Sequence, residues 1–310
     1  MPLHPTVAFI GSQMSEAMPI PMTSVAIDTL RRGVSTTVVP STIEVSSVTD
    51  STVSGVGGAI PVRIYRDAPA EQPTGTLVWQ HGGGFAMGDL EMSDDICRRF
   101  AKETGQTVVS VDYRLAPEHP FPAGLHDCRD VARWVATEPT ELGPSAGWFA
   151  LGGDSAGGTL ALLTAMMLRD AGEAEPACVL SVYGTASMEI TNPEFGDLPF
   201  LAKADADWFW NAYSDGKDLA GTRYYEPAST LSDSGLCPVL TITAENDPTR
   251  DGSEAFAATL QSRGIDAPCI RFAGMHHGFF GLVDVLSEAR LAFSAAESFL
   301  AKHGRETAAA

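Results

Sequence analysis

The chain has 310 residues, of which 44% are apolar, and 20 Lys and Arg against 39 Asp and Glu give a net charge of −19. A chain this acidic is unsuited to nucleic acid or anionic membranes, because both are bound through cationic patches. No run of 18 or more apolar residues occurs, so no membrane span is expected. We therefore predict neither a nucleic-acid partner nor a membrane partner.

The N-terminus and the cysteines favour a cytoplasmic protein. Residues 1–30 contain no Lys or Arg, so the basic start of a secretory signal peptide is missing. The five cysteines are odd in number, lie far apart and form no C-x-x-C pair. We expect reduced, mostly buried thiols rather than a disulfide framework. At the other end of the chain, residues 305–310 are expected to fray.

The first 40 residues differ from the rest of the chain. They are rich in Met and Pro and have no strong strand pattern. Residues 15–32 can hold one or two short helices, interrupted at Pro19-Ile20-Pro21. Composition leaves two interpretations open, a mobile arm or a cap whose Met side chains cover a binding site.

From about residue 42 the chain alternates between strand and helix patterns. Predicted strands are 60–66, 76–80, 107–111, 148–151, 178–183, 238–243 and 269–272. Predicted helices are 93–104 with Ser93 as N-cap, 126–137, 159–170, 251–263 and 287–302. Pro61 favours a position at the start of its strand or at a sheet edge. The alternation predicts a mostly parallel sheet with helices on both faces.

One long stretch breaks this alternation. Residues 185–229 show no strand pattern and include the aromatic run Trp208-Phe209-Trp210-Asn211-Ala212-Tyr213. A long insertion that carries aromatic residues is typical of a lid or cap over a site. The alternative is that Trp208 and Trp210 are ordinary core or helix-packing residues.

A candidate nucleophile lies between a predicted strand and a predicted helix. Residues 153–157 read Gly-Asp-Ser-Ala-Gly, which in this context indicates a nucleophile elbow. Such a turn holds the serine in a strained conformation at a helix N-terminus, where developing negative charge is favoured. A structural glycine turn is the alternative. We predict Ser155 as the nucleophile.

A glycine loop, His81-Gly82-Gly83-Gly84-Phe85, follows another predicted strand. Consecutive glycines let backbone N–H groups approach a ligand, as an oxyanion hole requires. A flexible loop or a phosphate cradle are alternatives, but the phosphate-binding glycine motifs are absent from the sequence. We predict the N–H groups of Gly83, Gly84 and Ala156 as oxyanion donors.

A serine nucleophile needs a base and an orienting acid, which follow it in the order acid, then histidine. The histidines after Ser155 are His276, His277 and His303, and the last lies near the chain terminus. We predict His277 as the base. His276 is then a polar loop residue or a supporting contact.

Three acidic residues follow the predicted strand 238–243, namely Glu245, Asp247 and Asp251. Asp251 is placed to cap the next helix. Glu245 lies at the strand end, where it can support the site. Asp247 precedes a proline that keeps it out of the helical conformation, and we predict it as the acid.

Several motifs together resemble the hormone-sensitive-lipase-like esterases of the α/β-hydrolase superfamily. The matching segments are 81–85, 112–123, 153–158, 247–252 and 274–279, in the family's order. The resemblance implies Ser155, Asp247 and His277 as the catalytic residues and the three donors above as the oxyanion hole. Thr249 stands where the family usually has Leu, and Gly252 where it has Glu. These departures bear on the packing of the loop rather than on the triad.

The resemblance also implies a fold and a domain arrangement. We expect an α/β-hydrolase fold, a mostly parallel central sheet flanked by helices and covered by a helical cap. Residues 1–45 and 185–225 would form the cap, and residues 46–184 and 226–304 the catalytic domain. A homodimer is also consistent with the family.

Other polar groups are interpreted as structural. Arg114 is expected to pair with Glu118 or a neighbouring acid and so to rigidify the loops near the oxyanion hole. His119 is a turn residue in this interpretation, and His81 anchors the glycine loop through a hydrogen bond. The acidic run 89–95 matches no calcium loop and is interpreted as a solvated helix N-terminus.

The sequence thus predicts a serine carboxylic-ester hydrolase that works through an acyl-enzyme on a small-molecule ester, with no metal and no cofactor. The resemblance implies short- to medium-chain acyl groups. Amides, lactones or formamides could be cleaved by the same three residues. A non-catalytic ligand receptor on this fold, or a structural protein, is the alternative from outside the hydrolases.

Overall fold

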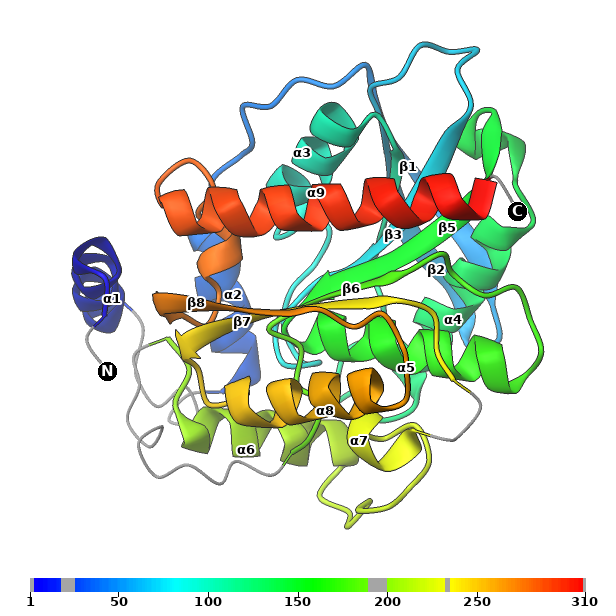
Figure 1. Cartoon of the computed structure of the whole chain (residues 1–310). Helices are drawn as coiled ribbons and strands as arrows, with labels where there is room; N and C mark the ends of the chain where they lie inside the picture. The colour runs from blue at the N-terminus through cyan, green and yellow to red at the C-terminus, as the bar shows by residue number, and fades with distance from the viewer. Residues whose placement is uncertain (1–2, 18–25, 189–199, 232–234, 309–310) are drawn as a thin grey trace.

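The computed structural model describes residues 3–17, 26–188, 200–231 and 235–308, and Figure 1 shows a sheet with helices on either side. The eight strands are β1 (Ser47–Gly55), β2 (Gly58–Arg66), β3 (Thr74–Gln80), β4 (Thr107–Val111), β5 (Ser145–Asp154), β6 (Val179–Val182), β7 (Val239–Asn246) and β8 (Cys269–His276). They lie in the order β1-β2-β4-β3-β5-β6-β7-β8. β2 is antiparallel to both of its neighbours, and the other pairs are parallel. The predicted mostly parallel sheet is confirmed.

The central strands are short apolar runs because both faces of the sheet are covered. Every residue of β3 and β4 is buried, which suits their content of Val, Leu and Thr. β1 was not predicted. It is an edge strand of Ser, Thr and Asp with mostly exposed side chains, so hydrophobic periodicity does not mark it.

Two apolar cores lie on the two faces of the sheet. On one face pack α3 (Asp94–Thr104) and α9 (Ser287–Ala308), and on the other pack α4 (Ala123–Ala136), α5 (Ala156–Asp170) and α8 (Arg250–Ser262) (Figure 1). α5 is buried from Ala156 to Arg169, so it is the central helix of its layer. This helix begins directly after the candidate nucleophile.

The remaining helices are α1 (Pro5–Ala17), α2 (Ile27–Thr37), α6 (Lys203–Ser214) and the single turn α7 (Pro227–Thr230), with 3₁₀ turns at Thr140–Leu142 and Phe279–Gly281. α2 and α6 are joined to the glycine loop by a small apolar cluster. It contains Leu30 of α2, Met87 of the loop, and Leu201 and Phe209 from the insertion. Two segments distant in sequence therefore meet over this loop.

Several predicted element ends need correction. The first helix begins at Pro5 rather than near residue 15, because a proline suits the first turn of a helix. The expected break at Pro19-Ile20-Pro21 lies outside the described residues. α4 begins at Ala123 rather than at residue 126. Ser93 does precede α3, but its side chain makes no capping bond. Pro61 lies inside β2, paired with Thr52 of the edge strand β1.

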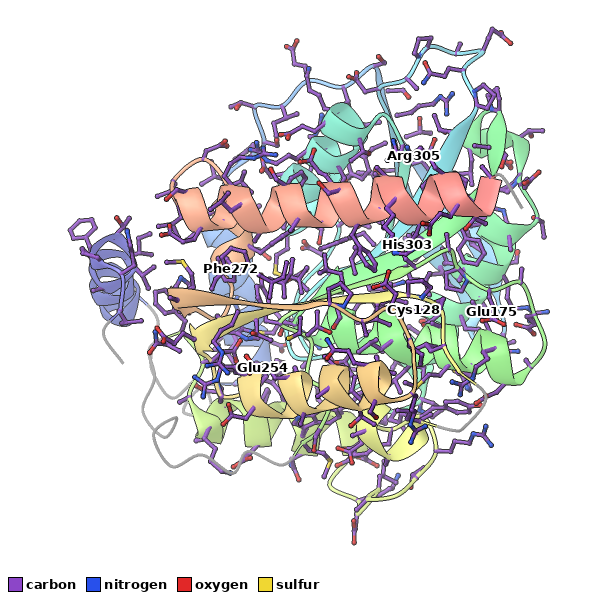
Figure 2. All side chains as sticks on the ribbon, viewed as in Figure 1. Cys128, Glu175, Glu254, Phe272, His303 and Arg305 are labelled. Carbon is purple, nitrogen blue, oxygen red and sulfur yellow. The ribbon has the colours of Figure 1, made fainter. Side chains whose placement is uncertain are left out.

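The expected fraying of residues 305–310 is wrong up to Ala308, since α9 continues to that residue. A Cβ on Gly304 would meet the Trp148 ring, so the last turns of the helix pack closely on β5. In Figure 2, His303 and Arg305 come from this part of α9; His303 is buried, whereas Arg305 is exposed.

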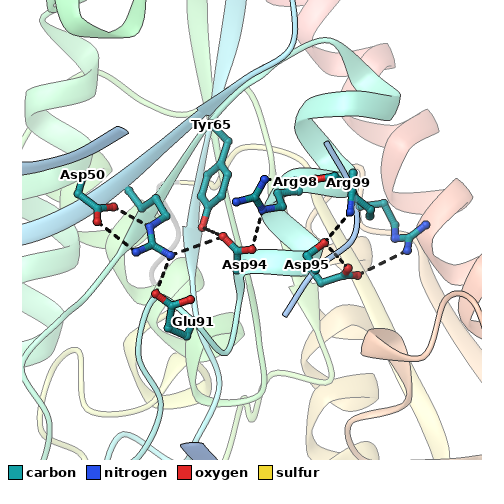
Figure 3. A network of polar contacts seen from close by, with 10 residues as sticks. Asp50, Tyr65, Glu91, Asp94, Asp95, Arg98 and Arg99 are labelled. Carbon is teal, nitrogen blue, oxygen red and sulfur yellow. Dashed lines mark hydrogen bonds and ion pairs between the residues drawn. The ribbon is translucent and has the colours of Figure 1, made fainter. Parts of the chain in front are cut away.

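Acidic residues of the run 89–95 form ion pairs and hydrogen bonds with neighbouring side chains, so the run is not simply a solvated helix end (Figure 3). Arg63 of β2 bonds Asp50 at 2.6 Å and Glu91 at 2.8 Å. Asp94 is 8% exposed and accepts hydrogen bonds from the Tyr65 hydroxyl at 3.0 Å and from Arg98 at 2.6 Å. These contacts join the outer strands to α3 and so fix the turn that precedes this helix.

Within the described ranges, no helix has the length and apolar character needed to cross a membrane. The same part of the chain holds no group of three or more His, Cys, Asp or Glu side chains arranged for a metal ion. Cys97, Cys128 and Cys178 are buried, and Cys237 and Cys269 are partly buried, as expected. Burial raises the pKa of the Cys269 thiol to about 11, which keeps it protonated near neutral pH.

Candidate active site

The three predicted catalytic side chains lie together at the carboxyl ends of the strands. Ser155 follows β5, Asp247 follows β7, and His277 follows β8. His277 Nε2 lies 2.8 Å from Ser155 Oγ, and His277 Nδ1 lies 2.7 Å from Asp247 Oδ2. The imidazole therefore bridges the serine and the aspartate, which is the contact order of a serine hydrolase triad.

Ser155 has the strained backbone of a nucleophile elbow, with φ of 53° and ψ of −124°. The glycines around it are required by close backbone approach. A Cβ on Gly157 would overlap the carbonyl oxygens of Gln80 and His81, and one on Gly153 would overlap the backbone of Gly157. The turn therefore fits between β3 and the start of α5 only with small residues.

Asp247 is fully buried, with 0% of the residue exposed. Its Oδ1 accepts the Thr249 N–H and the Thr249 hydroxyl, both at 2.8 Å, which leaves Oδ2 to His277. The two other candidate acids have different partners. Glu245 accepts the Gly274 N–H at 2.7 Å, and Asp251 pairs with Arg250 at 2.7 Å.

His276 contacts Phe200 and the backbone of His277, and among the described contacts it makes none with Ser155. It is the last residue of β8 rather than a loop residue, and it stacks on Phe200 with ring centroids 3.5 Å apart. Its Nδ1 bonds the carbonyl oxygen of His277. Burial lowers the pKa of His276 to about 4, so its ring is neutral near pH 7.

The glycine loop and the start of α5 together place Gly83, Gly84 and Ala156 in the lining of one cavity. Gly83 and Gly84 have φ of 108° and 61°, conformations that favour glycine. The Gly83 carbonyl accepts the N–H groups of Ala86 and Met87, which closes the loop into a turn. Within the described chain, the N–H groups of Gly83, Gly84 and Ala156 have no acceptor, so they are able to bind an oxyanion.

Gly82, just before these donors, is held on both sides. The His81 Nδ1–H donates to the Gly82 carbonyl at 2.7 Å, as expected, and the Gly82 N–H donates to Asp154 Oδ1 at 3.1 Å. Burial lowers the pKa of His81 to about 4. Burial raises the pKa of the Asp154 carboxyl to about 6, although His277 and the Gly82 N–H both lower it. Asp154 is therefore a titrating group next to the nucleophile, which the sequence did not reveal.

Arg31 of α2 forms hydrogen bonds with the backbone that follows the glycine loop. Arg31 donates to the carbonyl of Ala86 at 2.8 Å and to that of Ala116 at 2.9 Å, and it forms a two-bond ion pair with Glu118. Glu118 is thus not the partner of Arg114. Arg114 instead pairs with Asp127 at 2.8 Å, the neighbouring-acid alternative, while His119 is exposed.

A cavity of about 490 Å³ opens above Ser155. Its side-chain lining is mainly apolar and includes Met87, Met92, Phe200, Leu201, Phe209, Trp210 and Leu282. The insertion packs directly on the glycine loop. Phe85 stacks on Tyr213 with centroids 4.0 Å apart, and a Cβ on Gly84 would overlap the Phe209 ring. Trp210 lines the cavity and also belongs to a core cluster.

A protein-family model described as alpha/beta hydrolase fold matches residues 77–281, more than half of the chain. The chain belongs to the α/β-hydrolase family. Carboxylesterase NlhH of Mycobacterium tuberculosis is 35% identical over 232 residues, which cover 72% of this chain and 73% of that protein. Ethyl acetate hydrolase of Pseudomonas putida is 31% identical over 241 residues, 75% of each chain.

Among solved structures, a hyperthermophilic esterase from the archaeon Pyrobaculum calidifontis matches with a TM-score of 0.91 and 35% identity. The match covers 99% of this chain and 100% of that one. The expected kinship with the hormone-sensitive-lipase-like esterases is confirmed, and the chain is an enzyme of that family.

Proposed function

We propose that this α/β-hydrolase is a serine carboxylesterase in which Ser155 is the nucleophile, His277 the base and Asp247 the orienting acid. The observation that carries the proposal is the unbroken pair of contacts through His277, 2.8 Å to Ser155 Oγ and 2.7 Å to Asp247 Oδ2. The esterase relatives support ester hydrolysis as the reaction class.

In the proposed mechanism, His277 Nε2 takes the Ser155 proton as the hydroxyl oxygen attacks the ester carbonyl. The carbonyl oxygen becomes an oxyanion facing the N–H groups of Gly83, Gly84 and Ala156. Asp247 holds the imidazole and stabilises its protonated form. His277 then protonates the departing alcohol, and water hydrolyses the acyl-enzyme by the same proton transfers. The mechanism needs no metal and no cofactor.

We further propose the domain division given by the family. Residues 1–45 and 185–225 form the cap, and residues 46–184 and 226–304 form the catalytic domain. The contacts of Leu30 and Phe209 with the glycine loop support this division. A cytoplasmic location and a homodimer stay predictions.

The substrate we propose is an uncharged ester with a short to medium acyl chain. The cavity has the size of ordinary small-ligand sites, and no Lys or Arg is among its described lining residues. Amide, lactone or formamide hydrolysis with the same three residues is the alternative. A non-catalytic receptor is disfavoured because Ser155, His277 and Asp247 are in bonding contact.

The test is hydrolysis of p-nitrophenyl esters from C2 to C16 by the wild type and by Ser155→Ala and His277→Ala. We expect a maximum at short or medium chains and a loss of about 10⁴-fold or more in both variants, because triad members act as a unit. The exposed His119→Ala is the control and should keep full activity. A wild type that cleaves no ester and reacts with no serine-directed phosphonate contradicts the proposal.

A further inference from the structure

The acid of the site has an unusual partner two residues along the chain. Both the backbone N–H and the hydroxyl of Thr249 donate to the same oxygen, Oδ1 of Asp247, at 2.8 Å each. The backbone bond is the ordinary turn contact of an aspartate with the residue two positions on. The hydroxyl bond is additional, and an apolar side chain at this position could not make it.

The Thr249 hydroxyl could instead cap the helix α8, but it does not. Thr249 occupies the N-cap position of α8, where a threonine side chain commonly accepts an N–H of the first turn. Among the described contacts the side chain makes no such capping bond. Its other oxygen neighbour, the Tyr183 carbonyl, is farther away at 3.5 Å. The hydroxyl hydrogen is therefore directed at Asp247.

The direction matters because the two oxygens of Asp247 have different partners. With two donors on Oδ1, the carboxyl plane is fixed and Oδ2 faces His277 Nδ1 at 2.7 Å. Asp247 is fully buried, so a lost donor is not replaced by bulk water. Hydrogen bonds to a buried charged oxygen are among the stronger ones in proteins.

We propose that Thr249 is a positioning residue of the triad, whose hydroxyl orients the Asp247 carboxylate toward His277. The proposal rests on the proposed function, since it assumes that His277 acts as the base for Ser155. Thr249 also lines the cavity, but its hydroxyl is bonded to Asp247, so removing the hydroxyl while keeping the shape of the side chain affects the chemical step more than substrate binding.

The experiment compares Thr249→Val, which keeps the shape and removes the hydroxyl, with Thr249→Ser, which keeps the hydroxyl. On the best ester, we expect Val to lower kcat by about tenfold and to change KM by less than about twofold, because only the transition state loses stabilisation. Ser should stay within about threefold of wild type. Thr243→Val is the matched control, since its hydroxyl donates to Glu254 at 2.8 Å outside the site, and it should leave kcat unchanged.

A double-mutant cycle with Asp247→Asn separates positioning from a structural role. If Thr249 acts through the carboxylate, Thr249→Val should cost little more once Asp247 is changed. Three results overturn the proposal: a Val variant with wild-type kcat, a Ser variant as impaired as Val, or fully additive losses in the cycle. A wild type that hydrolyses no ester but still reacts with a serine-directed phosphonate refutes only the ester as substrate, while Ser155 stays the proposed nucleophile. In that case the rate of Ser155 labelling by a phosphonate tests Thr249 with the same variants.

Discussion

Replacing Arg31 by alanine should loosen the glycine loop from outside the cavity. Arg31 lies on α2, but its guanidinium reaches two backbone carbonyls, of Ala86 at 2.8 Å and of Ala116 at 2.9 Å. Ala86 lies just after the proposed oxyanion donors, and its N–H bonds the Gly83 carbonyl. Removing the guanidinium leaves both carbonyls without this donor, so α2 loses its hydrogen bonds to the loop.

The size of the effect follows from the contacts. The two partly buried carbonyl bonds contribute about 1 kcal/mol each to the free energy of unfolding. The ion pair with Glu118 adds only about 0.5 kcal/mol, because the Glu118 side chain is 49% exposed. The sum, about 2.5 kcal/mol, corresponds to a fall in Tm of roughly 4 °C for a chain of 310 residues. We also expect a lower kcat, since the loop carries two of the proposed oxyanion donors, Gly83 and Gly84.

The assay is thermal unfolding together with ester hydrolysis at 25 °C, with Arg32→Ala as the control. Arg32 is on the same helix but bonds Thr29 at the surface, so its loss should change the free energy of unfolding by less than about 0.5 kcal/mol. If Arg31→Ala melts and turns over like Arg32→Ala, then α2 does not hold the loop and the argument is refuted.

The same pair gives a pH dependence. The Arg31 hydrogen bond lowers the pKa of Glu118 from 4.5 to about 2. A carboxyl with a lowered folded-state pKa stabilises the fold above its ordinary pKa, and this stabilisation is lost as the pH falls toward the folded value. The difference in Tm between wild type and Arg31→Ala should therefore shrink between about pH 4.5 and 2. The part due to the two carbonyl bonds should remain.

Two further substitutions test the loop from inside the cavity. Burial raises the pKa of Asp154 to about 6, so the folded state holds the proton of this carboxyl more tightly than the unfolded state does. The stability of the wild type should therefore fall as the pH rises from about 4 to 6. The variant Asp154→Asn should lose most of this dependence when Tm is measured as a function of pH. The variant Gly84→Ala places a methyl group against the Phe209 ring at a residue whose φ is 61°, so kcat should fall strongly. Adding Phe209→Ala removes the clash and should restore part of kcat. If kcat does not recover, the backbone strain alone is responsible for the loss.

The sequence predicted the residues of the candidate site better than it predicted the contacts that hold those residues in place. Ser155 and the glycine loop are marked by local patterns that need small residues, and Asp247 is marked by its following proline. The bonds of Arg31 to Ala86 and Ala116 join residues that are 55 and 85 positions apart, and no local pattern predicts them. The chain end was misjudged for a similar reason, since its packing against Trp148 is visible only in three dimensions.

The Thr249 hydroxyl is an intermediate case. An aspartate followed two residues later by threonine is a recognisable turn pattern, so the backbone bond could have been foreseen. Whether the hydroxyl caps α8 or turns toward Asp247 depends on the position of the helix start, which the sequence places only to within a few residues.

The proposed base is carried by the outermost strand on its side of the sheet. β8 pairs with β7 alone, whereas β5, which leads to Ser155, lies between β3 and β6. A strand with one neighbouring strand opens at a lower free-energy cost than a central one, so we expect His277 to lose its contact with Ser155 before the sheet as a whole melts. We therefore expect the loss of activity on heating to begin at β8 rather than at the central strands of the sheet.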